Sequence, residues 1–173
     1  QTCALPILDP DVINGTTGGF KSAELAKIEE TLNLEKFEVS DAIEIGKIAL
    51  AIGEERKLSM AIEVRIGDWV VFHASLPGTN TENDWWMGRK ARVVNLTGHS
   101  SMHERVKAEE EKYDWFAKHG VKEEEYAIHG GGTPIKVRGK GLVGVLLISG
   151  LPQVQDHLIG VEVLTEFLAR AGE

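Results

Sequence analysis

The sequence predicts an α+β domain built on an antiparallel β-sheet of four to five strands. Apolar and charged residues alternate over 61–66, and a two-residue turn at Gly67-Asp68 leads into a second β pattern at 69–75, which is typical of a hairpin. A continuous apolar run at 142–149 indicates a further, buried strand. Helical patterns precede, separate and follow these strands, so the expected order is helix, two strands, two helices, two strands, helix.

The segment before the hairpin carries two helical patterns. Apolar residues three and four positions apart over 22–32 predict a short helix, which belongs to a partly flexible N-terminal arm at 1–37. A longer helix is expected to begin at Ser40 as its N-cap and to end at Gly53, with one apolar stripe facing the sheet. Residues 38–173 are expected to form a single domain.

Two more helices are expected between the hairpin and the last strands. Asn83 or Asp84 can cap the first of them. Ser101 and Glu104 have the spacing of a capping box for the second, which is expected to continue to Gly120.

The last third of the chain predicts two strands and a helix. Residues 125–137 read as a strand that three glycines interrupt, and a short turn leads to the buried strand at 142–149. Pro152 favours the first turn of a helix, and the residues after it carry a wide apolar face.

Composition excludes several classes of protein. The chain has 173 residues with 42% hydrophobic side chains, and no apolar run is long enough to cross a bilayer, so no membrane insertion is expected. A formal net charge of -8 argues against binding to nucleic acid. The single Cys3 cannot build a disulfide framework within the chain, which suits a cytoplasmic protein. Residues 1–10 lack the features of a signal peptide and are interpreted as processed or non-native sequence.

Three separated stretches, in order along the chain, resemble a known superfamily. They are the hairpin "IEVRIGDWVVFHAS", the segment "LPGTNTENDWWMGRKARVVNLTGHSS" and the segment "YAIHGGGTPIKVRGKGLVGVLLISGLPQVQDH". Together they resemble the haem-degrading-domain superfamily of HbpS-like and GlcG-like proteins, and within it a branch of short, functionally uncharacterised proteins. The resemblance covers about residues 38–168. It implies a profilin-like antiparallel sheet flanked by helices on both faces, assembly into dimers or rings of dimers, and haem as a candidate cofactor.

The start of the last helix presents an acid and an imidazole side by side. His157 could ligate a metal or haem iron, with a carboxylate that fixes its tautomer. The structural alternative is that Asp156 favours the positive end of the helix and accepts hydrogen bonds from loop amides. Adjacent residues of a helix point about 100° apart, so the two side chains do not easily share one pocket.

A glycine run follows another histidine. Gly130 and Gly131 remove side chains beside His129, so that a ligand or a neighbouring backbone can approach closely. A bulge that turns the imidazole inward is the structural alternative. The run lacks the spacing and the lysine of a phosphate-binding loop.

The remaining candidates lie on or before the two middle helices. Lys90 could pair with haem propionates, although a solvated charge is an alternative. His99 and His103 have the spacing of a metal pair, yet a cap at Ser101 would place His99 before the helix, so no metal site is predicted. Ser100 and Ser101 are interpreted as caps, because no Gly-x-Ser-x-Gly elbow surrounds them.

These observations leave two functions open. The first is an oligomeric small-ligand-binding domain for haem or another anionic planar compound. The second is an oligomeric interaction module that meets protein partners without small-molecule chemistry. No catalytic residue is assigned, and binding without turnover is favoured. The candidates for ligand binding or subunit contact are Lys90, His99, Ser100, Ser101, His129, Gly130, Gly131, Asp156 and His157. The sequence further predicts that Lys90, His99, His129 and His157 meet near one rim of the sheet.

Overall fold

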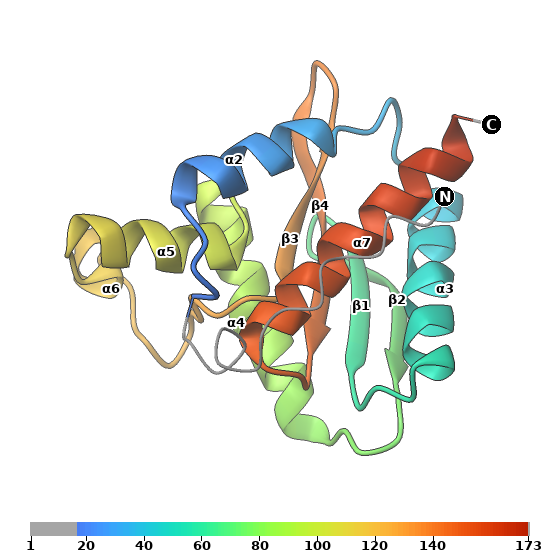
Figure 1. The fold of residues 1–173 in the computed structure, drawn as a ribbon, viewed down its shortest axis with the longest axis horizontal. Coiled ribbons are helices and arrows are strands. Elements are labelled where there is room, and N and C mark those ends of the chain that lie inside the picture. Colours follow the sequence, from blue (N-terminus) through green and yellow to red (C-terminus); the bar gives the residue numbers. More distant parts are fainter. Residues whose placement is uncertain (1–16, 173) are drawn as a thin grey trace.

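A four-stranded antiparallel sheet lies between helices in the computed structural model, which describes residues 17–172 (Figure 1). The strand order is β2-β1-β4-β3. The strands are β1 (Ala61–Ile66), β2 (Trp69–Ser75), β3 (Gly132–Val137) and β4 (Gly141–Ser149). The helices of this range are α2 (Ser22–Thr31), α3 (Val39–Glu55), α4 (Thr81–Thr97), α5 (Ser101–Glu111), α6 (Trp115–His119) and α7 (Gln153–Ala171). The predicted α+β class is therefore confirmed, and the interpretation of residues 1–10 lies outside the described residues.

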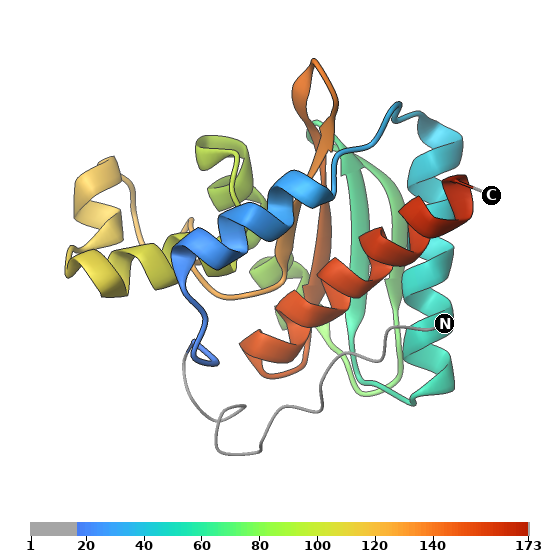
Figure 2. The same cartoon turned by 45° about the horizontal axis from the view of Figure 1, so that its top comes forward.

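Both faces of the sheet are covered, and strand alternation decides which residue faces which layer. Ile62 and Val64 of β1 pack into the core cluster that α3 and α7 share with β4. Ala61 points to the opposite face, where it packs with Met87 and Ala91 of α4. Figure 2 shows α3 and α7 on one side of the sheet, with α7 running obliquely across the strands. The central strand β4 therefore reads as a nearly continuous apolar run, because both faces of its second half are buried.

The hairpin has the predicted turn and a defined register. Gly67 has a φ of 57°, which a glycine adopts without steric cost. Ala61 pairs with Ser75, and the register shifts by a bulge between Val64 and Arg65. β1 also pairs antiparallel with β4, so β2 remains at an edge of the sheet.

Helix boundaries differ from the prediction at several points. The N-caps are Glu38, Asn80 and Ser100, each earlier in the chain than expected. Each of these residues has extended backbone, and its side chain accepts a hydrogen bond from a backbone N–H of the first helical turn, which is what an N-cap requires.

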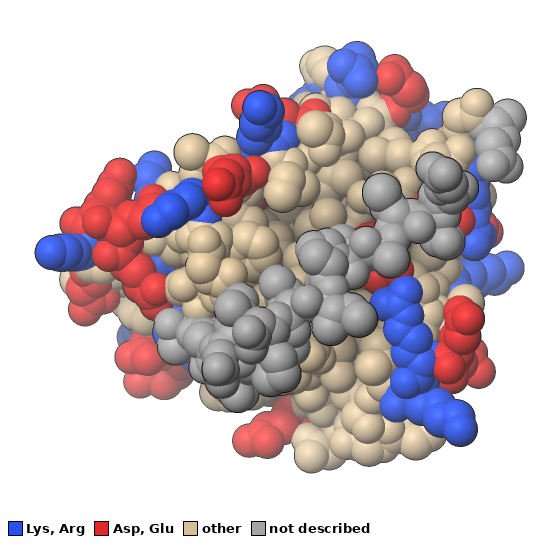
Figure 3. Space-filling view, viewed as in Figure 1, with Lys and Arg blue, Asp and Glu red and all other residues tan. Residues whose placement is uncertain are grey.

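The long helix expected from Ser101 to Gly120 is two helices. α5 ends at Glu111, and its C-cap Lys112 has a left-handed φ of 55°. Asp114 then caps α6, because its side chain accepts hydrogen bonds from the N–H groups of Phe116 and Ala117. Figure 3 shows acidic side chains gathered at the end of the molecule where α5 lies, and Glu109, Glu110 and Glu111 of α5 are exposed there.

The helix predicted in the N-terminal arm is present as α2, and it is packed. Leu25 of α2 is buried against Met102 and Val106 of α5 and against Val154 of α7. Among the helices of residues 17–172, none combines the length and the apolar composition that a membrane crossing requires.

Candidate functional site

A cavity of about 320 Å³ lies at the corner where β4 ends and α7 begins. Its lining comes from α4, from the loop before β3, from the end of β4 and from the first turn of α7. The lining residues are Asn83, Trp86, Lys90, His129, Ser149, Gly150, Leu151, Gln153 and Asp156. Segments far apart in the sequence therefore meet at this one corner.

A buried ion pair forms one wall of the cavity. The Lys90 Nζ of α4 lies 3.2 Å from the Asp156 Oδ2 of α7, and each side chain is only 3% exposed. Lys90 also donates a hydrogen bond of 3.0 Å to the carbonyl oxygen of Ile148, and Asp156 accepts one of 3.1 Å from the Leu151 N–H. The pair thus connects α4, the end of β4 and the start of α7.

Burial changes the acid–base properties of both partners. Desolvation lowers the pKa of Lys90, although the nearby Asp156 carboxylate opposes this shift. Desolvation also raises the pKa of Asp156 to about 6, against the opposing effects of Lys90 and of the Leu151 and Gly150 amides. Both directions favour the uncharged forms, so a proton passes between these two groups more easily than between an exposed lysine and an exposed aspartate.

His129 brings a neutral imidazole to the same cavity. Its ring makes a T-shaped contact with the ring of Trp86 at a centroid distance of 4.9 Å, and it makes no hydrogen bond within residues 17–172. Burial lowers the pKa of His129 to about 4, and the positive charges of Arg105, Lys90 and Arg89 contribute to that shift. The imidazole is therefore uncharged at pH 7, which is the form that binds a metal ion or accepts a hydrogen bond.

The glycines after His129 allow the backbone to approach the cavity wall. Gly131 has a φ of 126°, and a Cβ there would lie 2.2 Å from the Ile148 carbonyl oxygen and 2.8 Å from the Lys90 Nζ. A Cβ on Gly130 would lie 2.2 Å from the Gln153 carbonyl oxygen. The segment 126–131 is consequently a loop, and β3 begins later than predicted, at Gly132.

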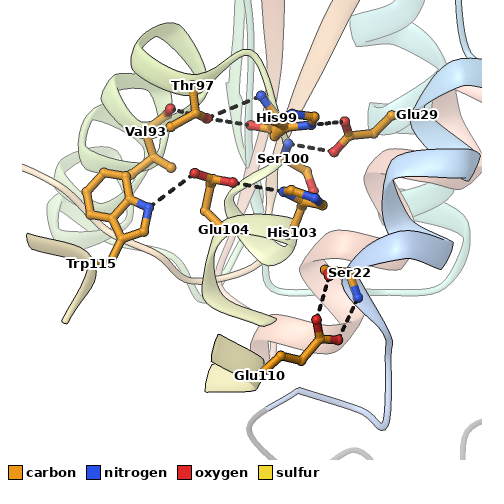
Figure 4. A network of polar contacts seen from close by, with 10 residues as sticks. All are labelled: Ser22, Glu29, Val93, Thr97, His99, Ser100, His103, Glu104, Glu110 and Trp115. Carbon is orange, nitrogen blue, oxygen red and sulfur yellow. Dashed lines mark hydrogen bonds and ion pairs between the residues drawn. The ribbon is translucent and has the colours of Figure 1, made fainter. Parts of the chain in front are cut away.

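A second polar cluster lies at the junction of α2 and α5 (Figure 4). Glu29 of α2 accepts a hydrogen bond of 2.8 Å from the Ser100 N–H, and its other oxygen lies 2.8 Å from the His99 Nδ1. The rings of His99 and His103 stack at a centroid distance of 4.2 Å. This cluster fixes α2 to the start of α5.

Glu104 extends the second cluster toward α6. Its oxygens lie 2.8 Å from the His103 Nδ1 and 3.2 Å from the Trp115 Nε1 (Figure 4). Burial alone would raise the pKa of Glu104, but the hydrogen bonds from His103 and Trp115 outweigh it and lower that pKa. Within residues 17–172, no group of three or more histidines, cysteines and acids is arranged to hold a metal ion.

His157 faces a different environment from its neighbour Asp156. It is buried against the ring of Phe20, with 5.6 Å between the ring centroids, and its Nδ1 has no hydrogen-bond partner among residues 17–172. Burial lowers the pKa of His157 to about 4. The divergence of these adjacent side chains follows from the 100° step of the helix.

The structure thus distributes the predicted residues over three places. Lys90, His129 and Asp156 line the cavity, with Gly130 and Gly131 packed beside its wall. Ser101 lies close by, because its Oγ accepts a hydrogen bond of 2.9 Å from the Gly132 N–H. His99 and Ser100 belong to the second cluster, and His157 lies apart from both.

Sequence reasoning did not assign the cavity residues Trp86, Ser149 and Gln153 to the site, and it treated Asn83 only as a cap. A signal for two of them is present in the sequence. Asn83, Trp86 and Lys90 follow one another by three and four residues, which places them on one face of α4. Ser149 and Gln153 had no such signal, because their position depends on the turn between β4 and α7.

Fold and site together define the class of this protein: an antiparallel sheet covered on both faces, with a polar cavity at a strand-to-helix corner. A family model described as "Haem degrading protein HbpS-like" matches residues 37–165, and the chain belongs to this HbpS-like family. The superfamily that the sequence motifs resemble is thereby confirmed.

Individual relatives agree with this assignment. A UPF0303 protein of Streptomyces avermitilis is 38% identical over 149 residues, which are 85% of this chain and 90% of that protein. The crystal structure of the Ybr137w protein superposes with a TM-score of 0.84 at 29% identity, over 96% of this chain and 99% of that one. The crystal structure of a PduOC:heme complex has a TM-score of 0.63 at 15% identity, over 75% of this chain and 93% of that one, and it shows a shared fold.

Proposed function

We propose that this protein is a small-ligand-binding domain, acting as a homo-oligomer, whose ligand occupies the cavity beside Lys90, His129 and Asp156. The observation that carries the proposal is the convergence of an amine, a neutral imidazole and a carboxyl group from three separate segments on one cavity. Its volume of about 320 Å³ lies within the range of small-molecule sites.

Haem is the ligand that the family description suggests first. The imidazole of His129 fits a haem iron, because it is uncharged at pH 7, borders the cavity and makes no hydrogen bond within the described residues. Bound haem would supply an iron centre, and this chain would hold it through His129, whose ring packs against Trp86. Lys90 contributes less to binding the propionates, since Asp156 already neutralises it.

A hemin titration of the purified protein tests this proposal. We expect a saturable Soret band that His129→Ala removes while the size of the oligomer stays the same. His73→Ala is the matched control, because His73 lies on β2 and outside the cavity lining. Hemin binding that His129→Ala leaves intact would contradict the role of this imidazole.

The second candidate function is an oligomeric protein-interaction module. Trp69 on the edge strand β2 is 61% exposed and Trp85 on α4 is 50% exposed, and exposed tryptophans are typical of protein interfaces. This reading needs no ligand in the cavity, and it predicts that loss of these tryptophans changes assembly while leaving hemin binding per subunit unchanged.

A further inference from the structure

We propose that Lys90 acts as a nucleophilic amine that forms an imine with a small aldehyde or 2-keto acid in the cavity. This inference rests on the proposed function, because it takes the same cavity as the ligand site. It adds a covalent step and a substrate class to that site.

The geometry places the amine at the cavity and next to a proton acceptor. Lys90 lines the cavity, and its Nζ uses two of its three hydrogens in contacts with the Ile148 carbonyl and Asp156. A Cβ on Gly131 would come within 2.8 Å of the Nζ, so glycine at this position avoids a steric contact with the amine. When one hydrogen passes to Asp156, a lone pair forms on the nitrogen, and rotation about the Cε–Nζ bond turns this lone pair toward a ligand in the cavity.

Imine formation requires an uncharged amine, and this site favours one. Desolvation lowers the pKa of Lys90, and a carboxylate lies 3.2 Å away to receive the proton. An exposed lysine has neither advantage. A buried lysine with a lowered pKa beside a paired acid in a cavity is also a typical feature of functional sites.

The reaction balances with the groups at hand. The ammonium of Lys90 gives one proton to Asp156, and the resulting amine attacks the carbonyl carbon, so that a C–N bond forms. Asp156 passes this proton to the carbonyl oxygen, then takes a second proton from the nitrogen and delivers it to the same oxygen. The oxygen leaves as water, the protonated imine remains, and no oxidant or reductant is consumed.

Other residues that line the cavity offer groups to hold the oxygens of such a substrate. Ser149 presents a hydroxyl, Asn83 an amide, and His129 an uncharged imidazole. These neutral groups can donate hydrogen bonds to a carbonyl or a carboxylate. The cavity volume of about 320 Å³ restricts the substrate to a small molecule.

Reductive trapping tests the inference on the full chain. The protein is incubated with acetaldehyde or pyruvate and sodium cyanoborohydride, and alkylated lysines are located by peptide mass spectrometry. We expect Lys90 to be alkylated at least tenfold faster than Lys140, which is exposed at the β3–β4 turn, and with a rate that saturates in the carbonyl compound. Asp156→Asn should reduce the Lys90 rate at least tenfold, whereas His73→Ala should not change it.

Two further variants keep the test decisive. Lys90→Met should abolish the saturable phase of lysine alkylation. If this single variant does not fold, the double variant Lys90→Met with Asp156→Asn is used in its place. Alkylation of Lys90 in the folded wild type that is no faster than that of Lys140 would overturn the inference. If Lys90 is not alkylated faster but hemin still binds through His129, the cavity remains the ligand site and only the imine is wrong. If neither hemin binding through His129 nor fast alkylation of Lys90 is observed, both proposals fail.

Discussion

His129 and His157 are two histidines that folding keeps uncharged, for partly different reasons. His157 is enclosed beside Phe20, and burial alone lowers its pKa to about 4. His129 is only partly buried, and the charges of Arg105, Lys90 and Arg89 add to the effect of desolvation. The first is a packed core residue, whereas the second keeps its ring nitrogens accessible at the cavity.

The His157 pKa makes a prediction about stability and pH. The folded-state pKa of about 4 lies below the ordinary 6.5, so the unfolded chain binds the extra proton first as the pH falls. Stability is therefore full above pH 6.5 and is lost as the pH falls through 4, by an amount on the order of 3 kcal/mol. His157→Leu should reduce this loss, which urea unfolding between pH 7 and pH 4.5 would measure. An unchanged pH profile in this variant would contradict a neutral, buried His157.

At the same scale, the sequence predicted the local direction of side chains better than it predicted their contact partners. Asp156 and His157 were expected to point apart because of helix geometry, and they do. The Lys90–Asp156 pair was not predicted, since it joins residues 66 positions apart. Periodicity describes one element at a time and carries no information about such contacts.

At the scale of elements, the Lys90–Asp156 pair holds α4 and α7 to the end of β4. Removing one partner of a buried ion pair leaves an uncompensated charge and typically costs about 3–5 kcal/mol, whereas neutralising both partners costs much less. The pair is therefore expected to hold the two helices in place while adding little net stability.

A double-mutant cycle tests this expectation. Lys90→Met alone should lower the free energy of unfolding by about 3–5 kcal/mol, because Asp156 is left buried without its ionic partner. Adding Asp156→Asn should restore at least half of that loss, since the amide oxygen can still accept the Leu151 N–H. Urea unfolding of the four proteins gives the coupling energy, and strictly additive losses would show that the two side chains do not interact.

Element boundaries were predicted less well than the elements themselves. The alternating pattern of β1 and the tight turn at Gly67 are local signals, and the hairpin was predicted correctly. The break between α5 and α6 arises because the Asp114 side chain accepts hydrogen bonds from backbone N–H groups that a continuous helix would use. The residues around Asp114 favour a helix, so the sequence does not reveal this break. The loop before β3 depends on close approach to Gln153 and Ile148, so only tertiary packing determines it.

At the scale of the whole molecule, the sheet keeps an open edge at β2. Trp69 on this edge and Trp85 on α4 are the two exposed tryptophans within residues 17–172. An unpaired edge strand and exposed aromatic side chains favour contacts with another chain. This surface lies outside the cavity lining, so the proposed interface and the proposed ligand site use different residues.

Assembly can therefore be separated from binding. Trp69→Ala is expected to weaken the oligomer at least tenfold, because it removes a large apolar side chain from the contact surface. Light scattering across a range of protein concentrations measures this change. Ile28→Ala is a suitable control, since Ile28 is an exposed apolar residue of α2. Equal masses for the wild type and both variants at every concentration would contradict an interface at β2.

The most direct test of the central claim is where a ligand binds on the folded chain. Hemin iron is paramagnetic and broadens the NMR signals of nuclei close to it. We predict that substoichiometric hemin first broadens the indole signal of Trp86 and the imidazole signals of His129. Broadening that begins at Trp69, with the signals of Trp86 and His129 unchanged, would contradict the cavity as the ligand site.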